Sequence, residues 1–496
     1  MAKQIQLDAN GKRKFGMMDK LAYAAGDFGC NMSFSLKGTV QTFWLVYMML
    51  ETGLLSALLL VVQIWDAIND PLIGSLIDSD RRKYKMGKFK TYIFIGAVGL
   101  LVAGALVFIP LPKSIRLSES TVSVVVKAIV FILGYIIWDA CYTIANVPYG
   151  SMLSLVSEDS GERAQLSTAR SIGSMIGNIL PMVLLPMLIW RKEVDANNNP
   201  VINPETGKQV ETLLGGRVFW VAIIMGVLGF ISFMFMIKKI TVRVDENSVK
   251  VNEGEKFNVF KAFGNFMKNR PAVGATVAAM AMFLGMNSAS TATTIMFATY
   301  FGKARWSGVT AAIGFVPMIL FIPFIKKIVD KWGKKEASVV GTLVSLGGGA
   351  LMFVFPLIPN ETASLAMYMV ALSIFGIGMG VYTCVSWALM ADAIDYNEWK
   401  TGKREEGTVY SLHSFFRKLA QGVGPSIVLL LMGALGYVSK LGTDGQSPET
   451  AYNMCWLVAG LYMFSAVLQF VGIALIYNLD KKTLAKMQSE LATRAK

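Results

Sequence analysis

Residues 52–79 read TGLLSALLLVVQIWDAINDPLIGSLIDS, and this stretch decides how the rest of the chain is interpreted. It exceeds the roughly 20 apolar residues that a helix needs to cross the hydrocarbon core of a bilayer. It also contains two carboxylates and an amide, Asp66, Asn69 and Asp70. Charged side chains are costly inside a membrane and usually mark the path of an ion or a polar solute. The stretch therefore predicts a membrane transporter.

The composition extends this prediction to the whole chain. Hydrophobic residues make up 54% of the 496 residues and charged residues 16%, whereas a soluble protein carries about 25% charged residues. The fold class expected is an all-α membrane protein with twelve transmembrane helices in two six-helix halves. The halves are predicted at 1–237 and 270–496, with a charged cytoplasmic linker at 238–269. The spans are predicted near 19–49, 52–79, 91–110, 122–150, 171–190, 217–237, 270–301, 307–325, 338–357, 363–395, 408–436 and 451–478.

The net charge of +14 is explained by where the basic residues lie. Most Lys and Arg residues fall in alternate loops and in both tails, which places these segments and both termini in the cytoplasm by the positive-inside rule. We expect contact with anionic membrane lipids and no binding of nucleic acid. No cleavable signal peptide is visible, so the first span is expected to direct insertion into the bacterial cytoplasmic (inner) membrane.

Residues that could support enzyme or metal chemistry are scattered. The four cysteines fall in apolar spans at unrelated spacings, which argues against disulfides and a metal site, and His413 is the only histidine. A membrane enzyme or a non-transporting sensor is the competing hypothesis, but no nucleophile–base pair or metal cluster supports an enzyme. We expect no enzymatic activity, no cofactor and no metal other than a coupling Na⁺.

A loop pattern repeats between the halves. An acid, a glycine and basic residues link spans two and three, in Asp78 and Gly87-Lys88-Phe89-Lys90. The same order, in Asp330-Lys331-Trp332-Gly333-Lys334-Lys335, links spans eight and nine. Two copies six spans apart resemble the loop signature of the major facilitator superfamily, whose fold is built from two six-span halves. Ordinary positive-inside loops would explain the basic residues, but not the repeated acid and glycine.

The acids of span two are candidates for a cation site. Asp66, Asn69 and Asp70 are spaced i, i+3 and i+4, so they share one face of a helix. Their oxygens form a hard anionic cage that suits Na⁺, or a proton shared between carboxylates. The plainer alternative is that these acids pair with a basic loop residue.

Span four and span one offer groups that could bind a sugar. Asp139, Thr143 and Asn146 share a helical face, with Trp138 and Tyr142 on an adjacent strip. Carboxylate, hydroxyl and amide groups bind sugar hydroxyls, and aromatic rings stack on C–H faces. The alternative is polar contact between helices. Two further candidates, Asp27 and Asn31, are spaced i and i+4 in span one.

Basic residues complete the candidate set. Arg170 lies at the cytoplasmic mouth of span five and is either a substrate ligand or an ordinary boundary arginine. Arg417 and Lys418 lie inside span eleven, where a lysine needs a carboxylate partner, and the acids of span two are the expected partners. His413 on the same span is either a proton relay or a packing residue.

These residues resemble the glycoside-pentoside-hexuronide:cation symporter family over nearly the whole chain. The stretch from Ile64 to Pro71 carries the most specific likeness. The supporting motifs are Gly87-Lys88-Phe89-Lys90, Asn146-Val147-Pro148-Tyr149-Gly150, Glu162-Arg163, Arg170 and Ala391-Asp392-Ala393-Ile394-Asp395-Tyr396.

The resemblance assigns roles to individual residues. It implies a cation site at Asp66, Asn69, Asp70 and Thr143. It makes Arg170 the arginine on the sugar side and Lys418 the essential lysine of span eleven. It implies a cytoplasmic gate at Arg163, Asp395, Tyr396 and Glu406. The substrate-binding set expected in total is Asp27, Asn31, Trp138, Asp139, Tyr142, Asn146, Arg170, His413 and Lys418.

The chain departs from the melibiose carrier of that family at three positions. Asn31 and Asn146 stand where that carrier has aspartates that bind the galactosyl group, and Gly150 stands where it has a stacking tryptophan. We therefore expect a glucuronide, xyloside or other pentoside rather than a galactoside. The expected function is import of a sugar or glycoside with H⁺ or Na⁺ by alternating access. The alternative within the same fold is a carrier of lysolipids or other amphiphiles.

Overall fold

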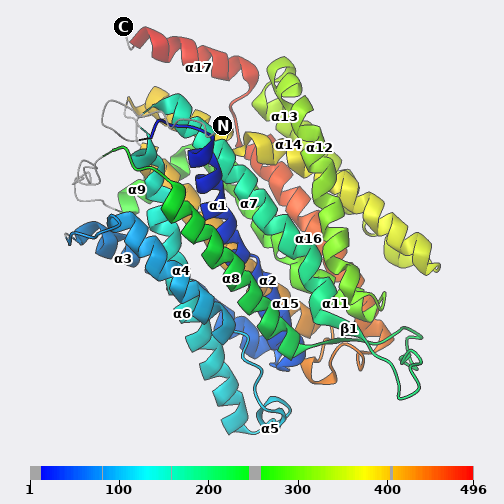
Figure 1. The fold of residues 1–496 in the computed structure, drawn as a ribbon. Coiled ribbons are helices and arrows are strands. Elements are labelled where there is room, and N and C mark those ends of the chain that lie inside the picture. The colour runs from blue at the N-terminus through cyan, green and yellow to red at the C-terminus, as the bar shows by residue number, and fades with distance from the viewer. Residues whose placement is uncertain (1–12, 81, 158, 245–258, 403–405, 495–496) are drawn as a thin grey trace, which may run out of the picture. The chain divides into compact units, whose positions relative to one another are not determined.

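The structure is a computed structural model that describes residues 13–80, 82–157, 159–244, 259–402 and 406–494, without the side chains of a few residues inside helices. Nearly all of it is helical (Figure 1). Two short strands, β1 (Trp190–Lys192) and β2 (Glu211–Leu213), pair at the base of a hairpin. The α-helices are α1 (Met17–Phe34), α2 (Leu36–Thr42), α3 (Thr52–Ser79), α4 (Lys88–Leu106), α5 (Lys113–Arg116), α6 (Thr121–Val156), α7 (Ser160–Ile189), α8 (Gly215–Lys239), α9 (Val259–Lys268), α10 (Arg270–Met282), α11 (Ala289–Thr299), α12 (Ser307–Trp332), α13 (Lys334–Leu351), α14 (Glu361–Thr401), α15 (Glu406–Ala434), α16 (Pro448–Phe470) and α17 (Lys481–Arg494).

All twelve predicted spans are helical. Among the described residues, ten helical stretches are long and apolar enough to cross a membrane. Of the other two predicted spans, one is formed by α12. The other is formed by α1 and α2, and a π-helical turn at Phe43–Tyr47 follows α2 directly. A second π turn, Phe283–Asn287, joins α10 to α11 within one span.

Two compact units make up the described chain. Unit 1 takes residues 1–191 and 212–253, and unit 2 takes residues 192–211 and 254–496. The hairpin that follows α7 in sequence therefore belongs to unit 2. The predicted boundaries of the two halves remain a prediction, and part of the predicted linker at 238–269 lies outside the described residues.

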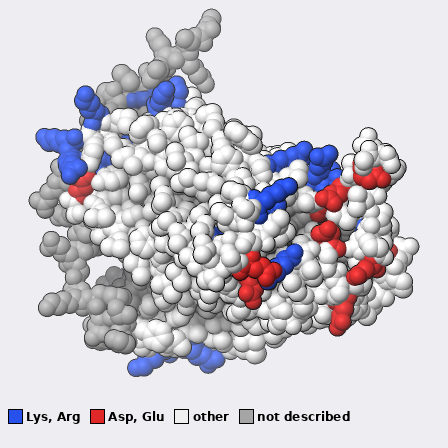
Figure 2. All heavy atoms as spheres, turned by 90° about the horizontal axis from the view of Figure 1, so that it is seen from below, with Lys and Arg blue, Asp and Glu red and all other residues white. Residues whose placement is uncertain are grey.

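One face of α6 carries an apolar stripe. Its large side chains recur every three or four residues and are exposed in the isolated chain, namely Val122, Val125, Ile129, Leu133 and Ile137. A stripe of this kind is suited to contact with lipid tails. Figure 2 shows charged side chains in separate groups on one face of the molecule, with uncharged surface between them.

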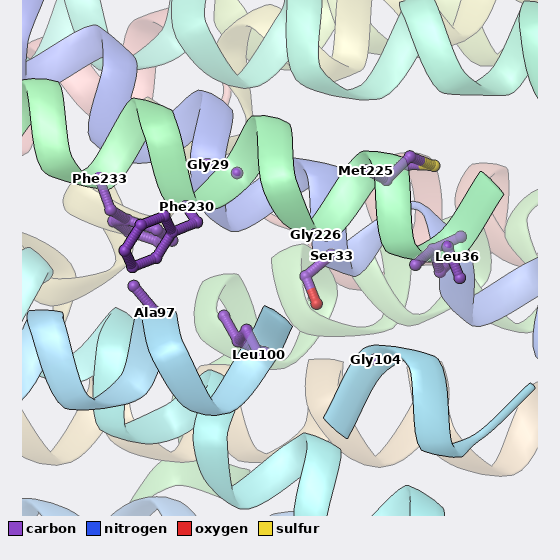
Figure 3. A pocket seen from close by; sticks show the side chains of 12 residues that line it. Gly29, Ser33, Leu36, Ala97, Leu100, Gly104, Met225, Gly226, Phe230 and Phe233 are labelled. Atoms are coloured by element: carbon purple, nitrogen blue, oxygen red, sulfur yellow. The ribbon is translucent and has the colours of Figure 1, made fainter. Parts of the chain in front are cut away.

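Small residues let α1 pack closely in unit 1. A Cβ atom added to Gly29 would lie 3.1 Å from the carbonyl oxygen of Gly229 on α8. The helices leave an apolar pocket at this contact, lined by Gly29, Leu36, Leu100, Gly226 and Phe233 among others (Figure 3). Its volume of about 10 Å³ is on the order of one water molecule, so the pocket is a packing gap and not a sugar site.

The glycines of the repeated loop pattern have the same unusual backbone. Gly87 has φ 88° and ψ 154° directly before α4. Gly333 has φ 108° and ψ 160° directly before α13. Residues with a Cβ atom rarely adopt this region. The shared conformation explains why both copies of the pattern need glycine at this position.

The hairpin of residues 192–211 is held to unit 2 by charged contacts. Lys208 pairs with Glu361 at the start of α14, and Lys303 binds the same carboxylate at 2.5 Å. The backbone N–H of Arg305 donates to the Glu211 carboxylate at 3.0 Å. Burial raises the pKa of Glu211 above its ordinary value, against the lowering effect of that hydrogen bond.

Candidate functional site

An acidic cluster lies in unit 1 where α3 packs against α6. The amide of Asn69 donates hydrogen bonds to the hydroxyl of Thr143 at 3.0 Å and to the carboxylate of Asp139 at 3.4 Å. The Thr143 hydroxyl in turn donates to Asp70 at 2.8 Å. Asn69 and Thr143 are almost fully buried. Three of the four residues predicted to bind the cation thus form one hydrogen-bonded chain.

Asp66, the fourth of these residues, faces a lysine. Lys37 on α2 places its Nζ 3.8 Å from the Asp66 carboxylate and 3.9 Å from the Asp139 carboxylate. Sequence patterns did not single out Lys37. The signal that could have found it is the presence of one lysine in the middle of the predicted span 19–49, where a charge is costly.

A second polar cluster joins α1 to α7. Arg170 Nε donates to the Asp27 carboxylate at 2.9 Å, and the Asp27 side chain is only 7% exposed. The amide of Asn31 donates to Asp27 at 3.0 Å and to the hydroxyl of Ser174 at 3.1 Å. Asn178 donates to the amide oxygen of Asn31 at 2.7 Å. Sequence patterns did not identify the two α7 residues, Ser174 and Asn178.

Helix α6 connects the two clusters. Its Asp139 and Thr143 face α3, while the amide oxygen of Asn146 accepts a weak hydrogen bond from Cys30 of α1 at 3.6 Å. The residues are spaced so that they share one side of the helix. Groups predicted to bind the cation and groups predicted to bind the sugar therefore lie on the same rigid element.

The aromatic residues predicted for sugar binding differ in their surroundings. Trp138 is 2% exposed, and its indole N–H donates to Ser33 at 2.7 Å. The ring of Tyr142 lies 6.0 Å from that of Phe34. Another ring, that of Tyr149, lies 5.1 Å from the guanidinium of Arg170. Tyr149 belongs to the quoted motif around Asn146, but it was not among the predicted sugar-binding residues.

The predicted residues of α15 lie in unit 2. The buried ring of His413 shares a hydrogen bond of 2.9 Å with the hydroxyl of Thr276. Arg417 stacks over the ring of Trp387 at 5.1 Å. Lys418 is exposed on α15 within the isolated chain. Its predicted pairing with the acids of span two remains a prediction.

The predicted gate residues lie at helix ends. Arg163 is in the first turns of α7, and Asp395 and Tyr396 lie near the end of α14. One turn before Asp395, the buried Asp392 binds Lys334 through both carboxylate oxygens at 2.8 Å. Lys334 directly follows the glycine of the repeated loop pattern. The side chain of Glu406 lies outside the described part of the chain.

Two acids at the ends of spans are also well bound. The carboxylate of Asp80 accepts hydrogen bonds from the hydroxyls of Tyr84 at 2.5 Å and Tyr92 at 2.7 Å, which with the N–H of Arg82 lower its pKa to about 2. The fully buried Asp19 binds Arg13 at 2.6 Å and Arg243 at 2.9 Å. These contacts hold the loop before α4 and the N-terminal end of α1 in place.

No group of three or more His, Cys, Asp or Glu residues that could hold a metal ion occurs in the described part of the chain. The acidic cluster of α3 and α6 instead mixes carboxylates with amide and hydroxyl oxygens. Such groups can bind a monovalent cation or exchange a proton, and the cluster of α1 and α7 can bind hydroxyl or carboxylate groups.

The helices and these buried charges define a membrane transporter of the major facilitator type. The MFS/sugar transport protein family matches residues 22–481, so the chain belongs to that family. The resemblance to the glycoside-pentoside-hexuronide:cation symporters, predicted from the motifs, is confirmed. The predicted fold class is confirmed as well, and the relatives are transporters rather than enzymes.

Two curated relatives and one solved structure illustrate the likeness. The glucuronide carrier protein homolog of Escherichia coli is 27% identical over 482 residues, which cover 96% of this chain and 95% of the relative. The isoprimeverose transporter of Lactiplantibacillus pentosus is 24% identical, over a match that covers 96% of this chain and 92% of the relative. The xylose transporter XylE from E. coli shares the fold with a TM-score of 0.55 at 13% identity. The match covers 96% of this chain and 99% of XylE.

Proposed function

We propose that this chain imports a glucuronide, xyloside or other pentoside in symport with H⁺ or Na⁺, by alternating access of its two halves. The single observation that carries the proposal is the pair of polar clusters joined by α6. One cluster holds the acids predicted to take the cation, and the other holds the Asp27–Arg170 pair. The names of the two relatives, a glucuronide carrier homolog and an isoprimeverose transporter, support the substrate class.

The cluster of α1 and α7 suits an oxygen-rich ligand. Asp27 and Asn31 present acceptors and donors to hydroxyl groups, as sugars require. Arg170 engages Asp27 through Nε, and its guanidinium has further N–H groups that can donate to a carboxylate such as that of a hexuronide. Asparagine at positions 31 and 146 makes this cluster less acidic than that of a galactoside carrier of the family.

The proposed setting is the bacterial cytoplasmic membrane with both termini in the cytoplasm. Coupling requires that the cation and the sugar each favour binding of the other by the same free energy. A shared helix such as α6 is a physical route for that coupling, because displacement of Asp139 or Thr143 also displaces Asn146.

The test is uptake of a labelled glycoside panel into vesicles, with Na⁺ and pH gradients imposed separately. We expect gradient-driven accumulation of a glucuronide or a xyloside by the wild-type protein. Asp70→Asn should abolish accumulation and leave some exchange of substrate. Full accumulation by Asp70→Asn would contradict the cation-site assignment, and competition by lysolipid would favour the amphiphile carrier instead.

A further inference from the structure

The proposed function gives no role to Lys37. This residue lies in α2, which continues α1 after Ser35, in a segment that reads SLKGTVQTFWLV over residues 35–46. A lysine inside a membrane span is costly, and it is usually kept where its charge is needed. The position of the Lys37 ammonium group indicates what its charge does.

The ammonium group bridges two carboxylates from different helices. Lys37 Nζ lies 3.8 Å from Asp66 of α3 and 3.9 Å from Asp139 of α6, so it is almost equidistant from them. The Asp139 side chain is fully buried, and its Oδ1 atom accepts no hydrogen bond from the described residues. The ammonium of Lys37 is therefore the compensating charge for that oxygen.

A single positive charge between two carboxylates acts as a bound monovalent cation does. It offsets their mutual repulsion and holds α3 and α6 at a fixed separation. A dissociable Na⁺ would have to displace the ammonium to occupy the same place. Because Lys37 is part of the chain, its effective concentration at the site is high and does not depend on which ions are in solution.

We infer that Lys37 is a built-in cation that excludes Na⁺ from between Asp66 and Asp139, so that the coupling ion of this chain is a proton. The inference rests on the proposed function and selects between its two coupling ions. The titratable and charged groups that face this site are Asp66 and Asp70 of α3, Tyr135 and Asp139 of α6, and Lys37 itself.

The test measures Na⁺ binding without any sugar. The melting temperature of the purified protein is followed as NaCl replaces KCl at constant ionic strength, because an ion that binds the folded state raises it. The wild-type protein and Lys37→Arg, which keeps the charge, should show no specific stabilisation. Lys37→Met should bind Na⁺ roughly a thousandfold more tightly, because a unit charge about 4 Å away is worth about 4 kcal/mol at an effective dielectric constant of about 20.

Transport supplies the second readout. The wild-type protein should accumulate glycoside under a pH gradient and not under a Na⁺ gradient, whereas Lys37→Met should respond to the Na⁺ gradient. Saturable stabilisation of the wild-type protein by Na⁺, or Na⁺-driven uptake by it, overturns the inference even if Lys37→Met does not fold. A folded Lys37→Met variant that ignores Na⁺ also overturns it. If the wild-type protein transports no glycoside at all, the proposed function fails while the Na⁺ titration still tests Lys37.

Discussion

Replacement of Gly333 by alanine should destabilise the protein. At φ 108° and ψ 160° the backbone is in a region that is strained for residues with a Cβ atom, which costs about 1–3 kcal/mol. The added Cβ would also collide with the Glu336 carboxylate and lie 3.0 Å from Cβ of Lys481. Glu336 accepts a hydrogen bond from the Lys481 N–H at 2.9 Å, and loss of this exposed bond adds about 1 kcal/mol at most.

The expected destabilisation is therefore about 1–4 kcal/mol, measured as a fall in melting temperature of the purified protein. Gly347→Ala, inside the helix α13 that follows Gly333, is the matched control, because a Cβ atom at Gly347 meets no atom within 4 Å. Alanine inside a helix should stabilise by about 0.5–1 kcal/mol relative to glycine.

Gly333→Ala should also reduce glycoside uptake. It displaces Lys334, whose ammonium binds both carboxylate oxygens of Asp392 beside the predicted gate. Equal melting temperatures for Gly333→Ala and the wild-type protein, with Gly347→Ala unchanged or higher, would refute the argument that the repeated pattern needs glycine for its backbone.

Three further substitutions test the polar and charged groups of unit 1. Arg170→Gln should abolish uptake and lower stability by about 1–3 kcal/mol, because the buried Asp27 loses its charged partner. Thr143→Val should weaken the response of uptake to the coupling cation roughly tenfold, since Asp70 and Asn69 both lose a hydrogen-bond partner. Asp80→Asn should lower the melting temperature at pH 6, and this difference should shrink as the pH falls below about 4.

The sign of the last effect follows from the pKa of Asp80, which is about 2 in the folded protein against an ordinary value of 3.8. A lowered carboxyl pKa contributes stability above the ordinary value, and that contribution is lost as the pH falls from about 4 to about 2. A difference between Asp80→Asn and the wild-type protein that is constant from pH 6 to pH 3 would contradict the assignment.

The other two variants have their own controls. Thr143→Ser keeps the hydroxyl and should retain most of the cation response, so equal losses in Thr143→Ser and Thr143→Val would argue against the hydrogen-bonded chain. Pairing Arg170→Gln with Asp27→Asn should restore stability but not uptake. Restored uptake in that double variant would remove the Asp27–Arg170 pair from the substrate site.

Local sequence patterns were sufficient to predict the membrane-spanning helices and several neighbours in the site. Asp27 and Asn31 are spaced i and i+4, and the structure joins them by a hydrogen bond. The long apolar blocks predicted all twelve spans, because the length of a bilayer-spanning helix is fixed by the thickness of the hydrocarbon core.

Contacts between distant parts of the chain were not predictable in this way. Asp19 binds Arg243, and a spacing rule cannot relate residues on opposite sides of several helices. The hairpin of residues 192–211 follows α7 in sequence but packs as part of unit 2. Lys37 was not predicted because it lies on α2 and its partner Asp66 lies on α3, and no fixed spacing relates the two helices.

The charged groups of unit 1 provide a physical route by which one helix couples two ligands. Asp27 is paired with Arg170, and Asp66 and Asp139 share Lys37. Asp139 and Asn146, which is predicted to bind the sugar, are seven residues apart on α6, about 10 Å along a helix. A packed helix moves as a unit, so under the proposed proton coupling a change of charge beside Asp139 alters the free energy of every position that α6 can take. If the sugar binds Asn146 as predicted, it selects among the same positions, and the two binding events must then affect each other equally.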